Sequence, residues 1–445
     1  MFNLDFILFN LTSQYLSHQK YLMKIYTLLV FMLFVFFSNR PKLVAQSDRS
    51  IDWKVDIDYL KLELPKRHKN LFFKYSQADF NESLDSLRVQ TDVLNNFEVS
   101  IKLQQIISRI GDSHTSIDNK LFLSKEKLLA MSSVWFSDGI YVVSVDKANK
   151  ELLGGKLKSI NGFTIQRIID SLSTLIVVDN NACLRRSIPN FFYISQILNY
   201  FGFMPDSIAT VEVENSQNMK IASTLSAKAY VDSLVVDTGP PEKPYYREFA
   251  SSFFSEKYFE NDSIYFVQYN TCWSKELEQE YGNKAKAANL PSFITFYQAV
   301  LKTLNEKPIK KMIFDMRYNS GGSSLQAMDF IDQLGRMEVL DKRKKLYVAI
   351  GRRTFSSAIL NANDFKRSTK AILIGEETAG RPNHYGEVKK LVLPSSRLSI
   401  SYSTKYFKRV SGDPPSLEPD IKCELSFLDY LKGIDPVYQY VKSAR

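Results

Sequence analysis

The chain has 445 residues, of which 44% are hydrophobic and 24% are charged. This composition is typical of a globular protein with a substantial core and excludes a low-complexity chain. The formal net charge is +10, but basic residues are scattered among acidic ones without a basic arm, so the sequence predicts no nucleic-acid partner. The cysteines, Cys183, Cys272 and Cys423, match no zinc spacing and are expected to be small buried side chains.

Residues 1–46 predict a signal peptide. Lys24 precedes an apolar run over 25–37, and residues 43–46 form a plausible cleavage region. Met23 is a candidate start of translation. We therefore expect an exported protein that is periplasmic, associated with the cell envelope or secreted. Membrane contact is expected only through this segment, if it stays uncleaved.

Residues 47–127 predict an N-terminal helical segment, because apolar residues between 84 and 110 recur at helical spacing. Gly111 is a suitable end for the last helix. Ser113 and His114 then lie in the following loop. His114 is one of only four histidines in the chain. His68 falls in a basic helical stretch and is interpreted as a surface residue.

Residues 128–235 predict a small β-rich module, with a strand at 139–145 and an Asn-Gly hairpin turn at 161–162. The stretch 236–256 is rich in Pro and Gly and is interpreted as a linker.

Residues 257–445 predict a mixed α/β domain in which strands alternate with helices, an order typical of a parallel sheet covered by helices. Two further strands, 388–393 and 398–404, are expected to be antiparallel and to close the domain. The alternating strands are expected at 264–269, 312–316, 345–350 and 371–374, and the helices at 290–304, 324–334 and 357–365.

A serine and a glycine turn fall at the carboxyl ends of two of these strands. Ser356 follows strand 345–350 and precedes a helix, where backbone N–H groups can stabilise an anion. Gly321 and Gly322 follow strand 312–316. Together with His114, Ser356 and these two glycines supply the components of serine acyl transfer. Ser357 is a rival nucleophile, since the two serines are adjacent.

Four blocks resemble the tail-specific, or C-terminal processing, peptidase family, which includes the tricorn protease. Residues 315–322 resemble its Asp-x-Arg-x-Asn-x-Gly-Gly block, and 354–358 (Thr-Phe-Ser-Ser-Ala) its nucleophile turn. Residues 375–380 resemble its Gly-Glu-x-Thr-x-Gly turn, and 417–421 its closing Pro-Asp block. The resemblance covers residues 50–430. It implies a crotonase-like catalytic domain, a PDZ-like module at 128–235 and the helical segment before it.

The resemblance also implies roles for individual residues. Ser356 would form the acyl-enzyme, and His114 would act as general base, with His384 as the alternative base. Gly321 or Gly322, with the backbone N–H of Ser357, would form the oxyanion hole.

The branch of the family is indicated by Arg381, which occupies the position of the lysine base in the bacterial processing peptidases. Arginine stays protonated and cannot accept the serine proton, so a Ser-Lys dyad is not available there. The tricorn branch uses Ser-His-Ser-Glu instead. Ser113 and His114 match its Ser-His pair, and Glu418 is the best match for its glutamate, with Glu387 as competitor.

Three charged residues have other predicted partners. Arg381 is expected either to bind a substrate carboxylate or to pair with Glu376 or Glu377. Asp315 and Arg317 are expected to be a structural ion pair at a strand end.

Together these features predict an exported serine endopeptidase that acts on a peptide or protein substrate without a cofactor or metal. An alternative is a catalytically inactive protein of the same fold that binds peptides or a small ligand. A third class is an envelope scaffold or receptor.

Overall fold

The computed structural model describes residues 51–445, except 125–126, 230–234, 241, 338–344 and 445. The predicted signal peptide, including Met23, lies outside these residues, so export stays a prediction. Among the described helices, none combines the length and the hydropathy that crossing a bilayer requires.

A six-stranded sheet forms the centre of the C-terminal part of the chain, in the order β16-β13-β12-β11-β10-β9. Neighbours are parallel except β9, which pairs antiparallel with β10. This arrangement confirms the predicted mixed α/β class. The strands are β9 (Phe254–Phe259), β10 (Ile264–Tyr269), β11 (Lys311–Asp315), β12 (Lys345–Ile350), β13 (Ile372–Gly375) and β16 (Ile421–Lys422).

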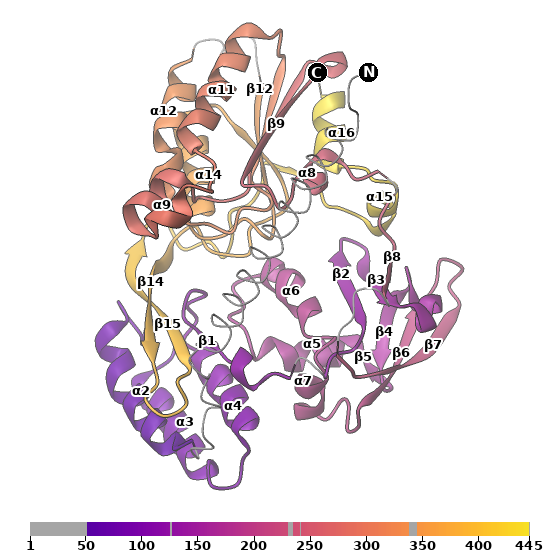
Figure 1. Ribbon diagram of the computed structural model, residues 1–445, viewed down its shortest axis with the longest axis vertical. Helices are drawn as coiled ribbons and strands as arrows, with labels where there is room; N and C mark the ends of the chain where they lie inside the picture. Colours follow the sequence, from indigo (N-terminus) through magenta and orange to yellow (C-terminus); the bar gives the residue numbers. More distant parts are fainter. Residues whose placement is uncertain (1–50, 125–126, 230–234, 241, 338–344, 445) are drawn as a thin grey trace, which may run out of the picture. The chain divides into compact units, whose positions relative to one another are not determined.

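Helices cover both faces of this sheet (Figure 1). Along β12, Val348 packs into one core, whereas Tyr347 and Ala349 pack into the other, because successive side chains of a strand point to opposite faces. The first core receives α11 (Phe293–Glu306), α12 (Met328–Arg336) and α14 (Ser357–Ser368). The second receives α8 (Tyr245–Glu248) and α16 (Pro436–Ser443). The predicted helix at 324–334 begins as a 3-10 turn, Ser324–Ala327.

The predicted β-rich module is a second sheet, with the main path β2-β3-β4-β6-β7. Asn161 and Gly162 both have positive φ, 50° and 76°, as a two-residue hairpin turn of this type requires. Three helices follow β5, namely α5 (Ile165–Ser173), α6 (Asn181–Ser187) and α7 (Ser195–Tyr200). The strands are β2 (Met131–Phe136), β3 (Gly139–Asp146), β4 (Lys156–Ile160), β5 (Phe163–Thr164), β6 (Ile208–Glu214), β7 (Lys220–Ser226) and β8 (Val235–Asp237).

The N-terminal segment is helical as predicted, with α2 (Trp53–Arg67), α3 (Gln77–Gln90) and α4 (Asn96–Ser108). Side-chain caps set where these helices begin. Asn95 and Glu98, for example, form a reciprocal capping box at the start of α4. The interpretation of His68 as a surface residue is wrong, because its side chain is fully buried.

The two antiparallel strands predicted to close the α/β domain do not join its sheet. β14 (His384–Val392) and β15 (Ser399–Phe407) form a separate sheet with β1 (Ser116–Asp118) and reach the N-terminal helices (Figure 1). The buried carboxylate of Asp56 accepts the backbone N–H groups of Ser395 and Ser396, at 2.7 and 2.8 Å, in the turn of this hairpin. Alternating hydrophobicity indicates a strand but not its partner, which is why this placement escaped prediction.

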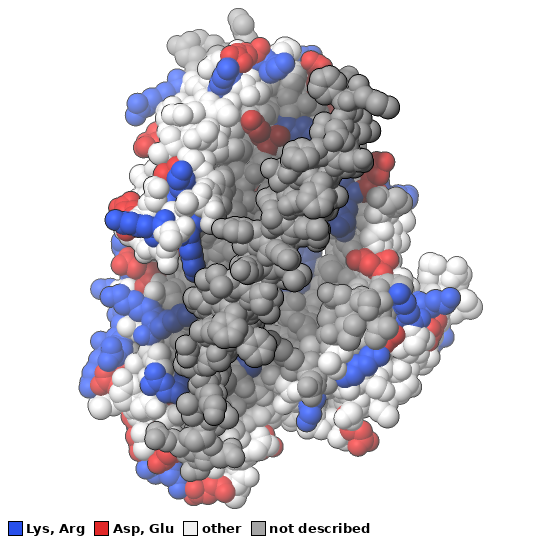
Figure 2. Space-filling model, in the orientation of Figure 1, with Lys and Arg blue, Asp and Glu red and all other residues white. Residues whose placement is uncertain are grey.

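Charges are mixed on the visible face of the molecule, where lysines and arginines alternate with acids (Figure 2). Cys183 and Cys272 are buried and Cys423 is partly buried, and all are free thiols. Within the described ranges, no group of three or more His, Cys, Asp or Glu side chains could hold a metal ion.

Candidate active site

Ser356 lies at the junction between the loop after β12 and helix α14. Its backbone has φ 54° and ψ −126°, and its side chain accepts no capping hydrogen bond from the helix. The Thr354 hydroxyl braces the loop, since it donates to the Met316 carbonyl at 2.8 Å and accepts the Gly351 N–H at 3.0 Å. A non-glycine residue with this backbone is strained, and such strain is a common feature of a nucleophile on a sharp strand-to-helix turn.

The glycine turn lies directly against Ser356. A Cβ on Gly321 would come within 2.8 Å of the Ser356 Cβ, and one on Gly322 within 2.3 Å of the Cys272 carbonyl oxygen. Both glycines have positive φ, 108° and 136°. Only glycine fits both the space and the backbone conformation here.

Two backbone donors beside Ser356 are free. The N–H groups of Gly322 and Ser357 make no hydrogen bond to any described residue. The Ser357 hydroxyl donates to the Gly322 carbonyl at 2.7 Å, which ties the two peptide segments together. The Gly321 N–H, by contrast, donates to the Asn319 side chain at 2.9 Å. Of the two predicted glycine donors, only Gly322 is therefore available for an oxyanion.

His114 reaches the same place from the loop after α4. Its ring stacks on Phe355, the residue before Ser356, with centroids 4.7 Å apart, and on His384 at 5.3 Å. The side chain is only 9% exposed. Neither ring nitrogen finds a hydrogen-bond partner among the described residues. No hydrogen bond therefore joins His114 to Ser356 in this structure, although its ring is beside the serine's neighbour.

The surroundings keep His114 neutral. Burial, together with the charges of His384 and Arg186, lowers the pKa of His114 to about 4, although Asp112 opposes this. The imidazole is consequently unprotonated near pH 7 and able to accept a proton.

Asp112 and His68 form a buried pair behind His114 that sequence reasoning missed. Asp112 accepts the Thr115 hydroxyl at 2.5 Å and the backbone N–H of His114 at 3.0 Å, and one of its oxygens lies 3.9 Å from His114 Nδ1. His68 Nδ1 accepts the Asn70 N–H, so in the neutral ring Nε2 donates to Asp112 at 3.0 Å.

The hydrogen bonds of this pair keep Asp112 ionised and hold the loop that carries His114. Burial alone would raise the pKa of Asp112, but hydrogen bonds from His68, Thr115 and His114 lower it to about 2. The position of Asp112, immediately before Ser113-His114, was the one available signal in the sequence.

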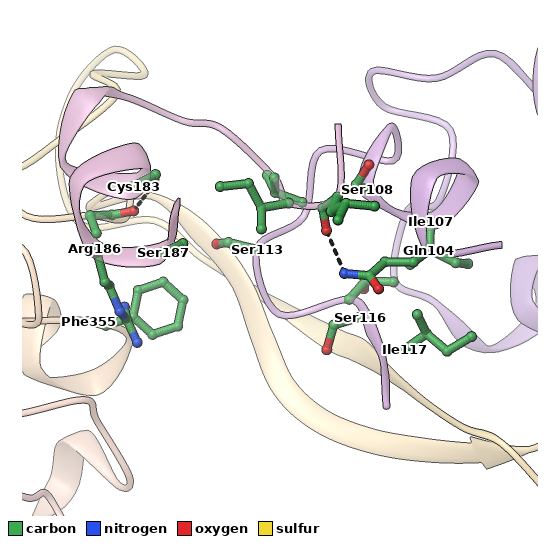
Figure 3. A pocket seen from close by; sticks show the side chains of 15 residues that line it. Gln104, Ile107, Ser108, Ser113, Ser116, Ile117, Cys183, Arg186, Ser187 and Phe355 are labelled. Carbon is green, nitrogen blue, oxygen red and sulfur yellow. Dashed lines mark hydrogen bonds between the residues drawn. The ribbon is translucent and has the colours of Figure 1, made fainter. Parts of the chain in front are cut away.

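Ser113 lines a small cavity of about 260 Å³, which Arg186 and Phe355 also line. Figure 3 shows Ser113 facing this cavity, with Arg186 extended along the ring of Phe355. Arg186 lies over that ring at 4.9 Å. His384, the alternative base, has its Nδ1 2.8 Å from the Arg381 carbonyl, so this nitrogen donates and is not free to take a proton.

The two candidate glutamates have other partners. Glu418 is 54% exposed, accepts the Ser416 hydroxyl at 3.0 Å and pairs with Lys422. Glu387 is 60% exposed and pairs with Lys405. The contacts described for either carboxylate include none to His114 or Ser113.

The predicted charge pairs have mixed outcomes. The Asp315–Arg317 pair is confirmed at 2.6 Å, and Arg317 also binds Asp435. The predicted pairing of Arg381 with Glu376 or Glu377 is wrong. Arg381 binds Asp179 at 2.7 Å and Asp413 at 2.8 Å instead. Glu376 is held by Arg352.

Comparison with known proteins supports the fold. No protein-family model and no curated protein sequence matches this chain. The structure is similar to mature CPAF complexed with lactacystin, with a TM-score of 0.60 and 13% identity over 88% of this chain and 97% of that chain. Another structure of mature CPAF gives a TM-score of 0.59 and 14% identity over 88% and 95%.

The tricorn protease is more distant, with a TM-score of 0.42 and 13% identity over 88% of this chain and 36% of that chain. A likeness at that level carries no argument about the branch. The chain thus has the fold of mature CPAF along nearly the whole length of both proteins.

Proposed function

We propose that this protein is an exported serine peptidase of the tail-specific type, with Ser356 as nucleophile and His114 as general base. The observation that supports this most directly is the junction at Ser356: a strained serine whose hydroxyl caps nothing stands beside two free backbone donors. The ring of a neutral, buried histidine stacks on its neighbour. The fold shared with CPAF supports the proposal, and the resemblance in sequence supplies the reaction class.

In the proposed reaction, Ser356 Oγ attacks the scissile carbonyl carbon while His114 takes the hydroxyl proton. The new oxyanion accepts hydrogen bonds from the N–H groups of Gly322 and Ser357, at the positively polarised start of α14. Collapse of the intermediate breaks the C–N bond, and His114 returns the proton to the leaving amine. Water then attacks the acyl-enzyme with the same base, which releases the acid and restores Ser356.

The base must approach the serine before this reaction begins. Catalytic hydrogen bonds often shorten only when substrate is bound, and the free nitrogens of His114 leave its ring able to accept the proton. In this proposal Asp112 is a positioning residue. It holds the backbone of His114 and places a fixed negative charge near Nδ1, which stabilises the imidazolium formed in the reaction.

A serine-directed fluorophosphonate probe tests the proposal. The chain without residues 1–46 should be labelled, and neither Ser356→Ala nor His114→Ala should be. The labelled peptide, mapped by mass spectrometry, should contain the adduct on Ser356.

Ser357→Ala is the matched control, because its hydroxyl is already bonded to Gly322. Labelling lost only in Ser357→Ala would move the nucleophile by one residue. A correctly folded parent that is never labelled would contradict the peptidase assignment.

A further inference from the structure

A second cavity, of about 940 Å³, opens beside the candidate active site. Its lining includes Ser320, which precedes the glycine turn, and Arg352 and Arg353, which lie in the loop that ends at Ser356. Strand β2 of the β-rich module and helix α6 supply the opposite wall. Arg186 lines both this cavity and the smaller one that contains Ser113. The position fits a channel for substrate residues adjoining the scissile bond.

The charge of this cavity is strongly unbalanced. Among the described residues of the lining, Glu376 is the one carboxylate, and it is already held by Arg352 at 2.7 Å. Six arginines line the cavity: Arg185, Arg186, Arg247, Arg317, Arg352 and Arg353.

Three of these arginines are neutralised by acids. Arg185 binds Glu424 at 3.0 Å. Arg317 and Arg352 are held by the pairs described above.

The other three, Arg186, Arg247 and Arg353, have no carboxylate partner among the described residues. Each instead lies over an aromatic ring: Arg186 over Phe355 at 4.9 Å, Arg247 over Tyr430 at 3.9 Å, and Arg353 over Tyr318 at 5.0 Å. Stacking of this kind holds a guanidinium in place and leaves N–H groups at its edge available for a carboxylate. One N–H of Arg247 also donates to the Tyr430 carbonyl at 3.5 Å.

Of these three arginines, Arg186 has the least favourable environment for its charge. Burial and the nearby charge of Arg353 lower its pKa. A guanidinium that is largely buried without an anion is costly, and two that repel one another are costlier. A bound carboxylate would relieve both costs.

We propose that this cavity binds an acidic side chain, Asp or Glu, of the substrate, with Arg186, Arg247 and Arg353 supplying the positive charge. This specificity rests on the proposed peptidase function and assigns its substrate class: peptides with an acidic residue near the scissile bond. The size of the cavity suits a side chain and its flanking backbone better than a lone inorganic anion.

The test uses the Ser356→Ala chain, so that binding is measured without turnover. Calorimetric titration compares the amidated peptide Ala-Ala-Glu-Glu-Ala-Ala with its Gln-Gln twin, at low and high salt. The Glu peptide should bind about 10-fold more tightly or better, since a charge-assisted pair is replaced by neutral contacts in the twin. High salt should reduce the difference.

Variants of the arginines identify the site. Arg186→Gln and the more exposed Arg353→Gln should each remove most of the preference for Glu. Arg167→Gln is the matched control, because Arg167 also lies over a ring, Phe163 at 4.9 Å, but outside the cavity. It should leave the preference intact.

Equal binding of the twins, no binding of either, or an equal loss in Arg167→Gln would overturn the proposal. A Gln peptide with a free carboxyl terminus is a further arm. If affinity follows that terminus and not the side chains, the acidic-side-chain assignment is also overturned.

Probe labelling of the parent chain separates the proposed specificity from the proposed peptidase function. A labelled parent without a preference for Glu loses only the specificity, and an unlabelled parent with an arginine-dependent preference loses only the peptidase function.

Discussion

Acidification should affect stability and catalysis at different pH values, because His114 is buried in its neutral form. The pKa of His114 falls from an ordinary value of 6.5 to about 4 in the folded chain. Since each pKa unit corresponds to roughly 1.4 kcal/mol, the native state opposes protonation by about 3 kcal/mol. The unfolded chain binds this proton near pH 6.5, whereas the folded chain binds it only near pH 4.

The sign of the effect follows from that difference. Above pH 6.5 the stability contributed by the neutral ring is fully present. It is lost progressively as the pH falls from 6.5 to 4, where the unfolded state binds more protons. In the same window the folded molecules keep a neutral base, so the rate of probe labelling per folded molecule should stay nearly constant down to about pH 5.

Urea denaturation of the parent and of His114→Gln, measured at intervals between pH 4 and pH 7, isolates this contribution. The pKa of His384 is also lowered, chiefly by burial, so it contributes with the same sign in both chains. The parent should lose about 3 kcal/mol more than the variant across the window. Equal slopes in the two chains, or a labelling midpoint at or above pH 6.5, would refute the reasoning.

Three further substitutions probe the surroundings of the serine. Gly322→Ala places a methyl group 2.3 Å from the Cys272 carbonyl oxygen, so the turn must shift. We therefore expect the labelling rate to fall on the order of 100-fold. An unchanged rate would exclude an oxyanion role for this turn. Ser357→Ala removes one buried hydrogen bond and should cost about 1 kcal/mol in urea unfolding, with Ser356 still labelled. Asp112→Asn removes the charge that raises the pKa of His114, so the acid limb of the labelling profile should move to lower pH; a slower rate with an unmoved limb would indicate a purely structural role.

Much of the fold is encoded locally and could be predicted. The strands over 264–269 and 345–350 have the bounds that their apolar runs indicate, and the Asn-Gly turn at 161–162 forms as its chemistry requires. Ser356 was located because a strand, a short loop and a helix start are each visible in the sequence. These signals depend on neighbouring residues, which a sequence displays directly.

The failures concern contacts between distant segments. His68 reads as part of a basic surface helix, yet it is buried against Asp112, which lies beyond two more helices along the chain. The unpaired arginines of the large cavity could not be predicted either, since the absence of an acidic partner is a property of three-dimensional packing. Arg381 illustrates the same limit: its nearest acids in sequence are Glu376 and Glu377, but its partners are Asp179 and Asp413.

The β14–β15 hairpin explains how His114 of the N-terminal segment comes to lie beside the turn that carries Ser356. At one end, Asp56 of α2 holds its turn, and β1, which follows the His114 loop, pairs with β15. At the other end, His384 at the start of β14 stacks on His114. Through these contacts the hairpin holds the His114 loop next to Phe355. Ser356 and its strained turn lie within one domain, whereas His114, the proposed base, reaches this turn only when the hairpin and the helical segment have assembled on each other. Folding of the N-terminal segment is thus a condition for the proposed active site to form, and not only for the stability of the chain.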